Sequence, residues 1–338
     1  MSHSRICIIG AGAIGGYVGA RLAQAGEDVT FLARGRTLEA IRAGGIELGD
    51  PDGSATRIAN VRAIEGSDGR ERFDVVLLAL KTYQLAGVAS RVEALCHDGT
   101  VVVTMQNGIP FWYFNGHGGP LAGRAIESVD PGGAIRDAIP ARRIVGCVVY
   151  IASELVGPGR ILHRSNDRLL VGEPDGSASE RAQRLATRLE HAGFTAPVIT
   201  DIRNEIWLKV WGNLSFNPVS ALERATLSGI CRHPEGRALV SQMMAEAAEV
   251  AGKLGVTFRM PIEKRIEGAA RVGDHKTSML RDVEAGRAIE VDALVGAVVE
   301  LGGLVGVPTP TITAIYQAAK LLDATLRRPS VPPASAGG

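Results

Sequence analysis

The chain has 338 residues, 46% of them hydrophobic and 22% charged, which is ordinary composition for a soluble protein with room for two domains. Its formal net charge of +1, with both signs interspersed, offers no attraction to nucleic acid or to an anionic membrane surface. The four cysteines lack the paired spacing of a zinc site or disulfide framework, and charged residues interrupt every long apolar run. We therefore expect reduced thiols, a cytoplasmic location, no metal centre and no membrane span.

The predicted elements begin with a strand, a glycine-rich turn, a helix and a second strand between Arg5 and Arg34. Gly10, Gly12 and Gly15 have the G-x-G-x-x-G spacing and directly follow an apolar run. In a dinucleotide site the first glycine permits a tight turn, the second leaves room for the pyrophosphate, and the third lets the helix approach the strand. The pattern predicts such a site, with an ordinary glycine loop as the alternative. Because a strand already begins at Arg5, we expect no signal peptide.

The end of the second strand bears on which nicotinamide cofactor is bound. NAD-binding chains tend to have an acidic residue there, whereas this chain has Ala33, Arg34, Gly35 and Arg36. A guanidinium group suits a 2′-phosphate, and no acid stands at this strand end to repel it. We therefore predict NADPH over NADH; an arginine on a solvated loop is the alternative.

A short helix and then a hairpin from Ile46 to Ile58 are expected next. Two buried strands follow, from Phe73 to Leu80 and from Thr100 to Met105. Because the carboxyl ends of parallel strands line the ligand crevice, the polar residues that follow, Lys81 and Asn107, are placed to meet cofactor and substrate. A solvated lysine and a common Asn-Gly turn are the alternatives.

The region from Pro110 to Pro140 is the least regular part of the chain. It opens with four consecutive aromatic residues, Phe111, Trp112, Tyr113 and Phe114. These form either a lid over the pocket or a packed cluster under a long loop. Because they follow the Asn107 turn, we predict that they belong to the substrate side.

The first domain is expected to close with further strands and a helix. We predict strands at 144–151, around 160–163 and at 168–171, a helix at 179–192 and a last short strand at 197–200. The composition then turns helical, so the domain boundary is placed near Thr200.

The helix predicted from Asn204 to Asn217 carries an unusual polar row. Lys209, Asn213 and Asn217 lie at i, i+4 and i+8, beside and partly within an apolar stripe. A partly desolvated lysine has its ammonium form disfavoured, which eases proton donation. The alternative is structural asparagines with a Lys209 that snorkels or pairs with Glu205.

More helices are predicted at 234–254, from about 261 and at 278–284. Beyond Gly286 a long helix is expected to place Glu290 in register with Leu294 and Leu301, while Asp292 points elsewhere. A carboxylate on an apolar face is either a functional acid or a buried structural ion pair, and both remain open.

These motifs together resemble the ketopantoate reductases (2-dehydropantoate 2-reductases) across nearly the whole chain. The glycine motif is shared by many dehydrogenases, and the helical row with its later partners is more specific. The matching residues are Gly10-Ala-Gly-Ala-Ile-Gly15, Lys81 in Leu80-Lys-Thr-Tyr-Gln84, Asn107-Gly108, Trp207-Leu-Lys209 with Asn213, Asn217 and Pro218, and the block from Ser278-Met-Leu280 to Glu290.

The resemblance implies an α/β fold with an N-terminal Rossmann dinucleotide-binding domain, residues 1–200, and a C-terminal all-helical substrate and catalytic domain, residues 201–326. Residues 327–338, rich in Pro, Ala, Ser and Gly, are expected to be a disordered tail. The implied activity is NADPH-dependent reduction of 2-dehydropantoate to pantoate in pantothenate biosynthesis. The expected partner is a small 2-oxo acid, and a homodimer is compatible with the resemblance.

The resemblance also implies roles for single residues. Lys209 would be the general acid that protonates the oxo oxygen, Glu290 would bind substrate and position that lysine, and Asn107 would orient both near the nicotinamide. Ser278 would hold the substrate carboxylate, while Asn213 and Asn217 would contact its hydroxyl end. Arg34 and Lys81 would take the 2′-phosphate side. The cofactor contacts would come from Gly10, Gly12, Ala13, Ile14, Gly15, Arg34, Lys81, Asn107 and Glu290.

Two departures from the family pattern concern the substrate. Leu227 stands where the family often has a further asparagine, and the segment from Phe111 to Gly133 is longer than usual. The alternatives are a reductase of another 2-oxo acid or of an imine, and a non-catalytic NADP-binding sensor. Retention of Lys209 and Glu290 argues against the sensor, because binding a dinucleotide needs neither.

Overall fold

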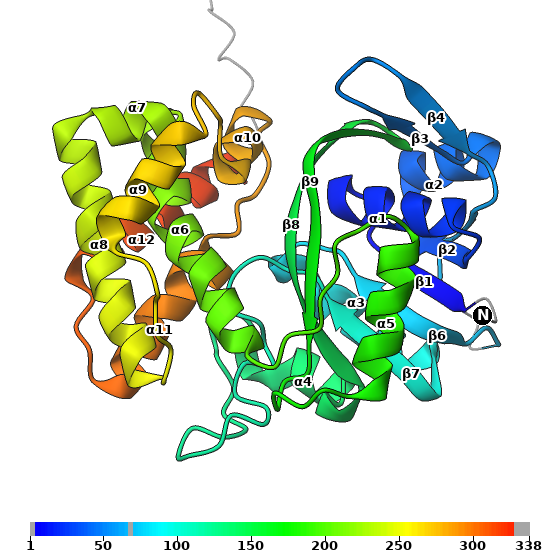
Figure 1. The fold of residues 1–338 in the computed structure, drawn as a ribbon, viewed down its shortest axis with the longest axis horizontal. Helices are drawn as coiled ribbons and strands as arrows, with labels where there is room; N and C mark the ends of the chain where they lie inside the picture. The colour runs from blue at the N-terminus through cyan, green and yellow to red at the C-terminus, as the bar shows by residue number, and fades with distance from the viewer. Residues whose placement is uncertain (1–3, 67–69, 328–338) are drawn as a thin grey trace, which may run out of the picture. The chain divides into compact units, whose positions relative to one another are not determined.

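The computed structural model describes residues 4–66 and 70–327 (Figure 1). They form two compact units that divide between Ile206 and Trp207. The first unit is built of strands and helices and the second of helices, which confirms the predicted fold class. Of the tail expected to be disordered, residues 328–338 lie outside the described residues.

In the described part of the first unit, nine strands form one mixed sheet in the order β4-β3-β9-β8-β7-β6-β1-β2-β5. The stretch from β5 to β8 is parallel throughout, whereas β9 pairs antiparallel with β8 and parallel with β3, and β4 pairs antiparallel with β3. Strands β1, β2 and β6 are buried on both faces along almost their whole length, which explains their near-continuous apolar runs. The strands are β1 (Arg5–Ile9), β2 (Asp28–Leu32), β3 (Ile46–Gly49), β4 (Ala55–Ile58), β5 (Arg62–Ile64), β6 (Phe73–Leu78), β7 (Cys96–Thr104), β8 (Ile144–Gly157) and β9 (Arg160–Gly172).

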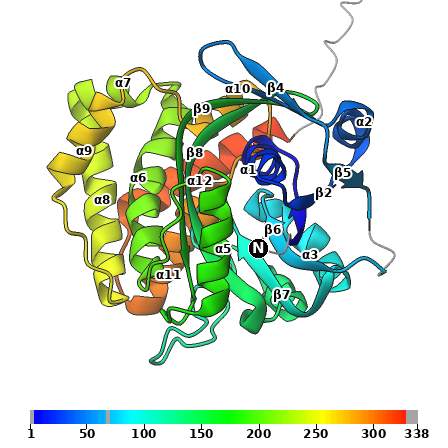
Figure 2. The same cartoon turned by 45° about the vertical axis from the view of Figure 1, so that its right-hand side comes forward.

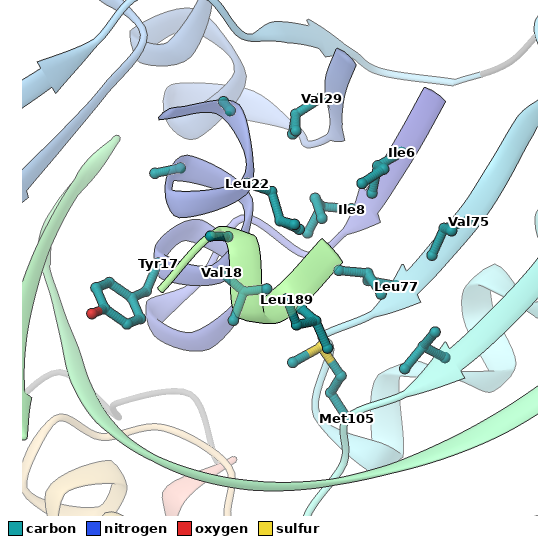
Figure 3. Packing of buried hydrophobic residues seen from close by; sticks show 14 of the residues in the cluster. Ile6, Ile8, Tyr17, Val18, Leu22, Val29, Val75, Leu77, Met105 and Leu189 are labelled. Atoms are coloured by element: carbon teal, nitrogen blue, oxygen red, sulfur yellow. The ribbon is translucent and has the colours of Figure 1, made fainter. Parts of the chain in front are cut away.

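Helices cover this sheet. On one face, Val18 and Leu22 of α1 and Leu189 of α5 belong to the same buried cluster as Ile8 and Leu77 of the sheet (Figure 3). The cluster therefore fixes α1, the helix that follows the glycine turn, against the strand that precedes it. The helical segments of this unit are α1 (Ala13–Gln24), α2 (Gly35–Gly44), η1 (Thr82–Gln84), α3 (Ala86–Ala94), η2 (Pro131–Gly133), α4 (Ala134–Ala138), η3 (Ala141–Arg143) and α5 (Glu180–His191).

Strands β8 and β9 form one long curved hairpin (Figure 2), where shorter separate strands were predicted. Beyond Ile151 the residues are partly exposed and include polar ones, so the apolar pattern fades while the backbone ladder continues. The strand predicted at 197–200 is wrong in extent, because only an isolated bridge between Val198 and Val171 is present.

The four consecutive aromatic residues are all buried, with at most 4% of any one exposed. The indole N–H of Trp112 donates to Thr104 Oγ1 at 2.8 Å, and the rings of Tyr113 and Phe114 meet edge to face at 5.0 Å. Arg203 Nε donates to the carbonyl of Tyr113 at 2.9 Å. The packed cluster is therefore confirmed, and the burial of these side chains does not support the prediction that they face the substrate.

The second unit is organised around α8, which packs against α7, α9, α11 and α12. Met243 and Met244 of α8 are fully buried, and the indole N–H of Trp211 donates to the Met244 carbonyl at 2.7 Å. Helix α6 begins in the first unit and continues into the second. The helical segments are α6 (Ile202–Glu223), α7 (Leu227–Arg232), α8 (Pro234–Lys253), α9 (Ile262–Arg271), α10 (Ser278–Glu284), η4 (Asp292–Gly296), α11 (Ala297–Val305) and α12 (Pro310–Leu326).

The long helix expected beyond Gly286 begins only at Val291, so Glu290 stands just before it. Its first part, η4, is a π-helical turn, which holds more residues per turn than an α-helix. Asp292 in this turn faces α12, where it accepts the Tyr316 hydroxyl at 2.6 Å and pairs with the Lys320 ammonium at 3.0 Å. The expected register of Glu290 with α11 is thus corrected, because a wide turn separates them.

Candidate active site

The carboxyl ends of β1, β2, β6 and β7 meet at one edge of the sheet, because these strands are parallel and adjacent. Strand β2 lies on one side of β1 and β6 on the other, so the strand order reverses at β1. Such a switch point is where open α/β sheets bind ligands. Gly10, Arg34, Lys81 and Asn107 follow these four strands, so the structure brings the predicted cofactor residues to one edge.

The three glycines of the turn differ in what they are needed for. Gly10 has a φ of +107°, which favours glycine, and a Cβ at Gly15 would lie 2.0 Å from the carbonyl oxygen of Gly10 and 2.7 Å from Ala79 Cβ. Gly12, in contrast, has φ −83° and ψ −163°, which any residue adopts, and a Cβ there would meet nothing within 4 Å. The fold thus explains the first and third glycines and leaves open space at the second.

This space lies at the N-terminus of α1, where Gly12 is the N-cap and contributes no side chain. Ala13 and Ile14, the first residues of the helix, are half-exposed. A helix N-terminus presents backbone N–H groups and a positive dipole end, which suit a pyrophosphate. The turn therefore fits the phosphates of a dinucleotide.

The strand ends that carry Lys81 and Asn107 are tied together by Gln106, which the sequence did not single out. Its amide Nε2 donates to the carbonyl of Leu78 at 2.6 Å and to that of Leu80 at 3.2 Å. Both Lys81 and Asn107 are half-buried. Because one side chain links the residues before each of them, these two groups are held at neighbouring points of the same edge.

A pocket of about 740 Å³ opens beside the end of β2. Arg34 contributes to it, and so do two charged residues that sequence reasoning missed, Glu65 and Arg91. Glu65 follows β5, a strand of only three residues that gives little periodic signal. The end of β2 itself carries no acid, but its neighbour β5 supplies one to the same pocket. The pocket is lined by Leu32, Arg34, Glu65, Gly66, Ser90, Arg91, Ala94 and Leu95.

On α6, the predicted polar row borders a buried face. Trp207, Trp211 and Leu214 are almost completely buried, whereas Lys209 and Asn213 are half-buried. Half-burial is the environment in which a lysine side chain keeps access to a ligand while losing part of its hydration.

Farther along α6, Asn217 is buried, with 6% exposed, and Pro218 follows it within the helix. Pro218 has no N–H to donate to the carbonyl of Leu214, and Ser215 Oγ donates to the carbonyl of Trp211 at 3.0 Å. The regular helical ladder is therefore altered beside Asn217.

Ser278 and Glu290 come from two other segments of the second unit. Ser278 is exposed and opens α10, whose N-cap Thr277 accepts the N–H of Leu280 at 3.2 Å. Glu290 is buried, with 7% exposed. The predicted site residues of this unit thus include both an open hydroxyl group and a desolvated carboxyl group.

The chain before Glu290 is anchored by a buried carboxylate on α12. Asp323 accepts the N–H of Ile289 at 2.9 Å and the Nε–H of Arg327 at 2.7 Å. Asp323 itself is 4% exposed. This anchor fixes the backbone one residue from Glu290, a support that no sequence pattern indicated.

Residues 4–66 and 70–327 contain neither a metal-binding cluster nor a membrane-spanning helix. No group of three or more histidine, cysteine, aspartate or glutamate side chains there could hold a metal ion. No helix in the same ranges is long and apolar enough to cross a membrane.

Two family models together match most of the chain. The family model "Ketopantoate reductase PanE/ApbA" matches residues 6–176, and "Ketopantoate reductase PanE/ApbA C terminal" matches residues 201–323. The chain is 51% identical over 312 residues to the 2-dehydropantoate 2-reductase of Mesorhizobium japonicum, covering 92% of this chain and 95% of the relative.

Solved structures agree with this result. A crystal structure of a candidate ketopantoate reductase from Ralstonia solanacearum is similar with a TM-score of 0.91 and 41% identity, over 96% of this chain and 99% of that one. The 2-dehydropantoate 2-reductase of Geobacter metallireducens is similar with a TM-score of 0.81 and 27% identity, over 94% and 99%.

Proposed function

Because the chain belongs to the ketopantoate reductase family, we propose that it reduces 2-dehydropantoate to pantoate with NADPH, as a step of pantothenate biosynthesis. The observation that carries the proposal is the 51% identity to a 2-dehydropantoate 2-reductase over 92% of the chain. The open space at Gly12 supports it independently, because a glycine that the fold does not require is what a pyrophosphate-binding turn needs. A cytoplasmic location goes with this biosynthetic role, and assembly as a homodimer stays a prediction.

The first unit would hold the dinucleotide. The turn from Gly10 to Gly15, with Ala13 and Ile14, would bind the pyrophosphate, while Arg34 and Lys81 would bind the 2′-phosphate side. Asn107 would lie toward the nicotinamide, because it follows a neighbouring strand at the same edge. The bound cofactor supplies the hydride that reduces C2 of the oxo acid.

The second unit would supply the proton. Lys209 would protonate the oxo oxygen as C2 is reduced, and its half-buried position keeps the side chain accessible to a substrate. Glu290 would bind the substrate and orient the lysine, a role that suits a buried carboxyl group on an anchored segment. Ser278 would hold the substrate carboxylate, and Asn213 and Asn217 would bind its hydroxyl end.

The proposal is tested by NADPH oxidation with the purified full-length protein. The substrates compared are 2-dehydropantoate, pyruvate and 2-oxoisovalerate, each with the wild type and with Lys209→Ala as the control for background oxidation. We expect the highest kcat/KM for 2-dehydropantoate. A clear preference for another oxo acid would replace the substrate and keep the chemistry, whereas no turnover with any of them would contradict the proposed reaction.

A further inference from the structure

The pairing of β2 with β5 places two opposite charges in one pocket. Leu32 and Ile64 are partners in the parallel ladder, and the N–H of Ala33 donates to the carbonyl of Ile64 at 3.0 Å. The two segments that follow these strands therefore leave the sheet side by side. The residues that follow, Arg34 and Glu65, both line the pocket of about 740 Å³.

These charges respond in opposite ways to a 2′-phosphate. A guanidinium group attracts this group through charge-assisted hydrogen bonds, whereas a carboxylate repels it. A carboxylate in turn accepts hydrogen bonds from the free ribose hydroxyls of NADH, which is why NAD-binding sites usually carry an acid at the end of the second strand, the position of Arg34 in this chain. One pocket thus holds a group suited to each cofactor.

We propose that Glu65 is a specificity-determining residue that opposes Arg34, so that the chain accepts both NADPH and NADH and prefers NADPH only moderately. The inference rests on the proposed function, since it assumes that the pocket receives the adenosine end of the dinucleotide. Arg91, on α3, adds a second guanidinium group, so the lining residues that the structure describes have a positive balance of two arginines against one glutamate. NADPH therefore remains the preferred cofactor.

The size of the effect follows from exposure. The side chains of Arg34 and Glu65 are both exposed, so solvent and salt screen their fields. A 2′-phosphate carries about −1.5 to −2 charges at neutral pH, which strengthens the repulsion relative to a single charge. We expect Glu65→Gln to raise the preference for NADPH over NADH by roughly two- to tenfold. Most of the change should be tighter binding of NADPH, because glutamine still offers a hydrogen-bond acceptor.

The experiment measures the dissociation constants of NADPH and NADH by titration calorimetry, with the wild type, Glu65→Gln and a control, Glu180→Gln. The control removes the same charge from the same unit, at an exposed residue of α5 that pairs with Arg184 and does not line the pocket. Titrations with adenosine 2′,5′-bisphosphate and ADP test the pocket without the nicotinamide half. The preference should rise in Glu65→Gln, stay constant in Glu180→Gln, and the rise should shrink at high salt.

An unchanged ratio of the two dissociation constants in Glu65→Gln overturns the inference, as does an equal change in the control. Turnover of 2-dehydropantoate by the wild type together with an unchanged ratio would leave the proposed function standing alone. A ratio that shifts as expected in a protein without turnover would keep the inference and refute the proposed reaction. If neither dinucleotide binds, both fail.

Discussion

Replacing Gly12 with alanine separates the ligand role of the glycine turn from its structural role. Two opposing effects on the free energy of unfolding are expected from this change. Alanine at a compatible backbone conformation stabilises by about 0.4–1 kcal/mol through the unfolded chain, whereas alanine is a poorer N-cap than glycine by up to about 1 kcal/mol. Because a Cβ at Gly12 meets nothing within 4 Å, no packing penalty is added. The free energy of unfolding should therefore change by less than about 1 kcal/mol.

Binding should respond very differently. The added methyl group would occupy the space that the pyrophosphate needs, and forcing an extra methyl into a filled site costs about 1–3 kcal/mol. The dissociation constant for NADPH should thus rise roughly 5- to 150-fold. Calorimetric titration gives the affinity, and urea unfolding followed by circular dichroism gives the stability.

Gly15→Ala is the matched comparison, since its Cβ would lie 2.0 Å from the Gly10 carbonyl oxygen. It should destabilise the unit by at least the roughly 1–3 kcal/mol typical of overpacking. Two results would refute the reasoning about Gly12. An unchanged affinity of Gly12→Ala for NADPH would show that the pyrophosphate does not bind at this turn. A loss of stability in Gly12→Ala would show that the glycine has a structural role.

Variants at Lys209, Glu290, Arg34 and Asp323 test other parts of the site. Lys209→Ala should lower kcat by roughly a hundred- to ten-thousand-fold while NADPH still binds, and Glu290→Ala should weaken substrate binding as well as turnover. The double variant should lose less transition-state stabilisation than the sum of the two single variants. Near-normal turnover by a folded Lys209→Ala protein would show that this lysine only snorkels. Arg34→Ala should weaken NADPH binding by roughly 10- to 150-fold, because it removes a charge-assisted contact worth about 1.5–3 kcal/mol, and should leave NADH binding almost unaffected. Equal losses of affinity for the two cofactors would show that the 2′-phosphate binds elsewhere. Asp323→Ala should lower the free energy of unfolding in urea by about 1–3 kcal/mol, because it leaves the N–H of Ile289 without its acceptor, and should lower kcat through Glu290. Asp323→Asn, which keeps an acceptor, is the control. An unchanged urea midpoint in the alanine variant would show that the anchor is dispensable.

The sequence was most informative where one short stretch determines the local structure. The glycine turn and the hairpin from Ile46 to Ile58 were predicted because the positions of glycine and turn residues restrict the backbone directly. The long β8–β9 hairpin was predicted as shorter separate strands, because antiparallel strands continue by backbone pairing after their apolar pattern has ended.

Other features depend on contacts between distant residues. Glu65 was missed because its place in the pocket follows from the pairing of β5 with β2, and a strand of three residues is too short to be predicted from its sequence pattern. Glu290 was given a helical position because an apolar period continues past it, and nothing in that period indicates a π-helical turn. Asp323 is 33 residues after Glu290, so its role as an anchor beside that residue was not visible either.

The π-helical turn at Asp292–Gly296 has a consequence for how this chain tolerates changes in length. On one side of the turn, the segment that ends at Glu290 is fixed to α12 through Ile289 and Asp323. On the other side, α11 is fixed by its packing against α8. A π-helical turn holds about one residue more than an α-helical turn, so deleting a single residue from it would restore ordinary helical geometry and keep the two sides nearly in register. Deleting a residue within α11 would instead rotate one side against the other by about 100° and displace either the carboxylate or the core. The loss of one residue should therefore be tolerated more readily in the turn than in the helix that follows it.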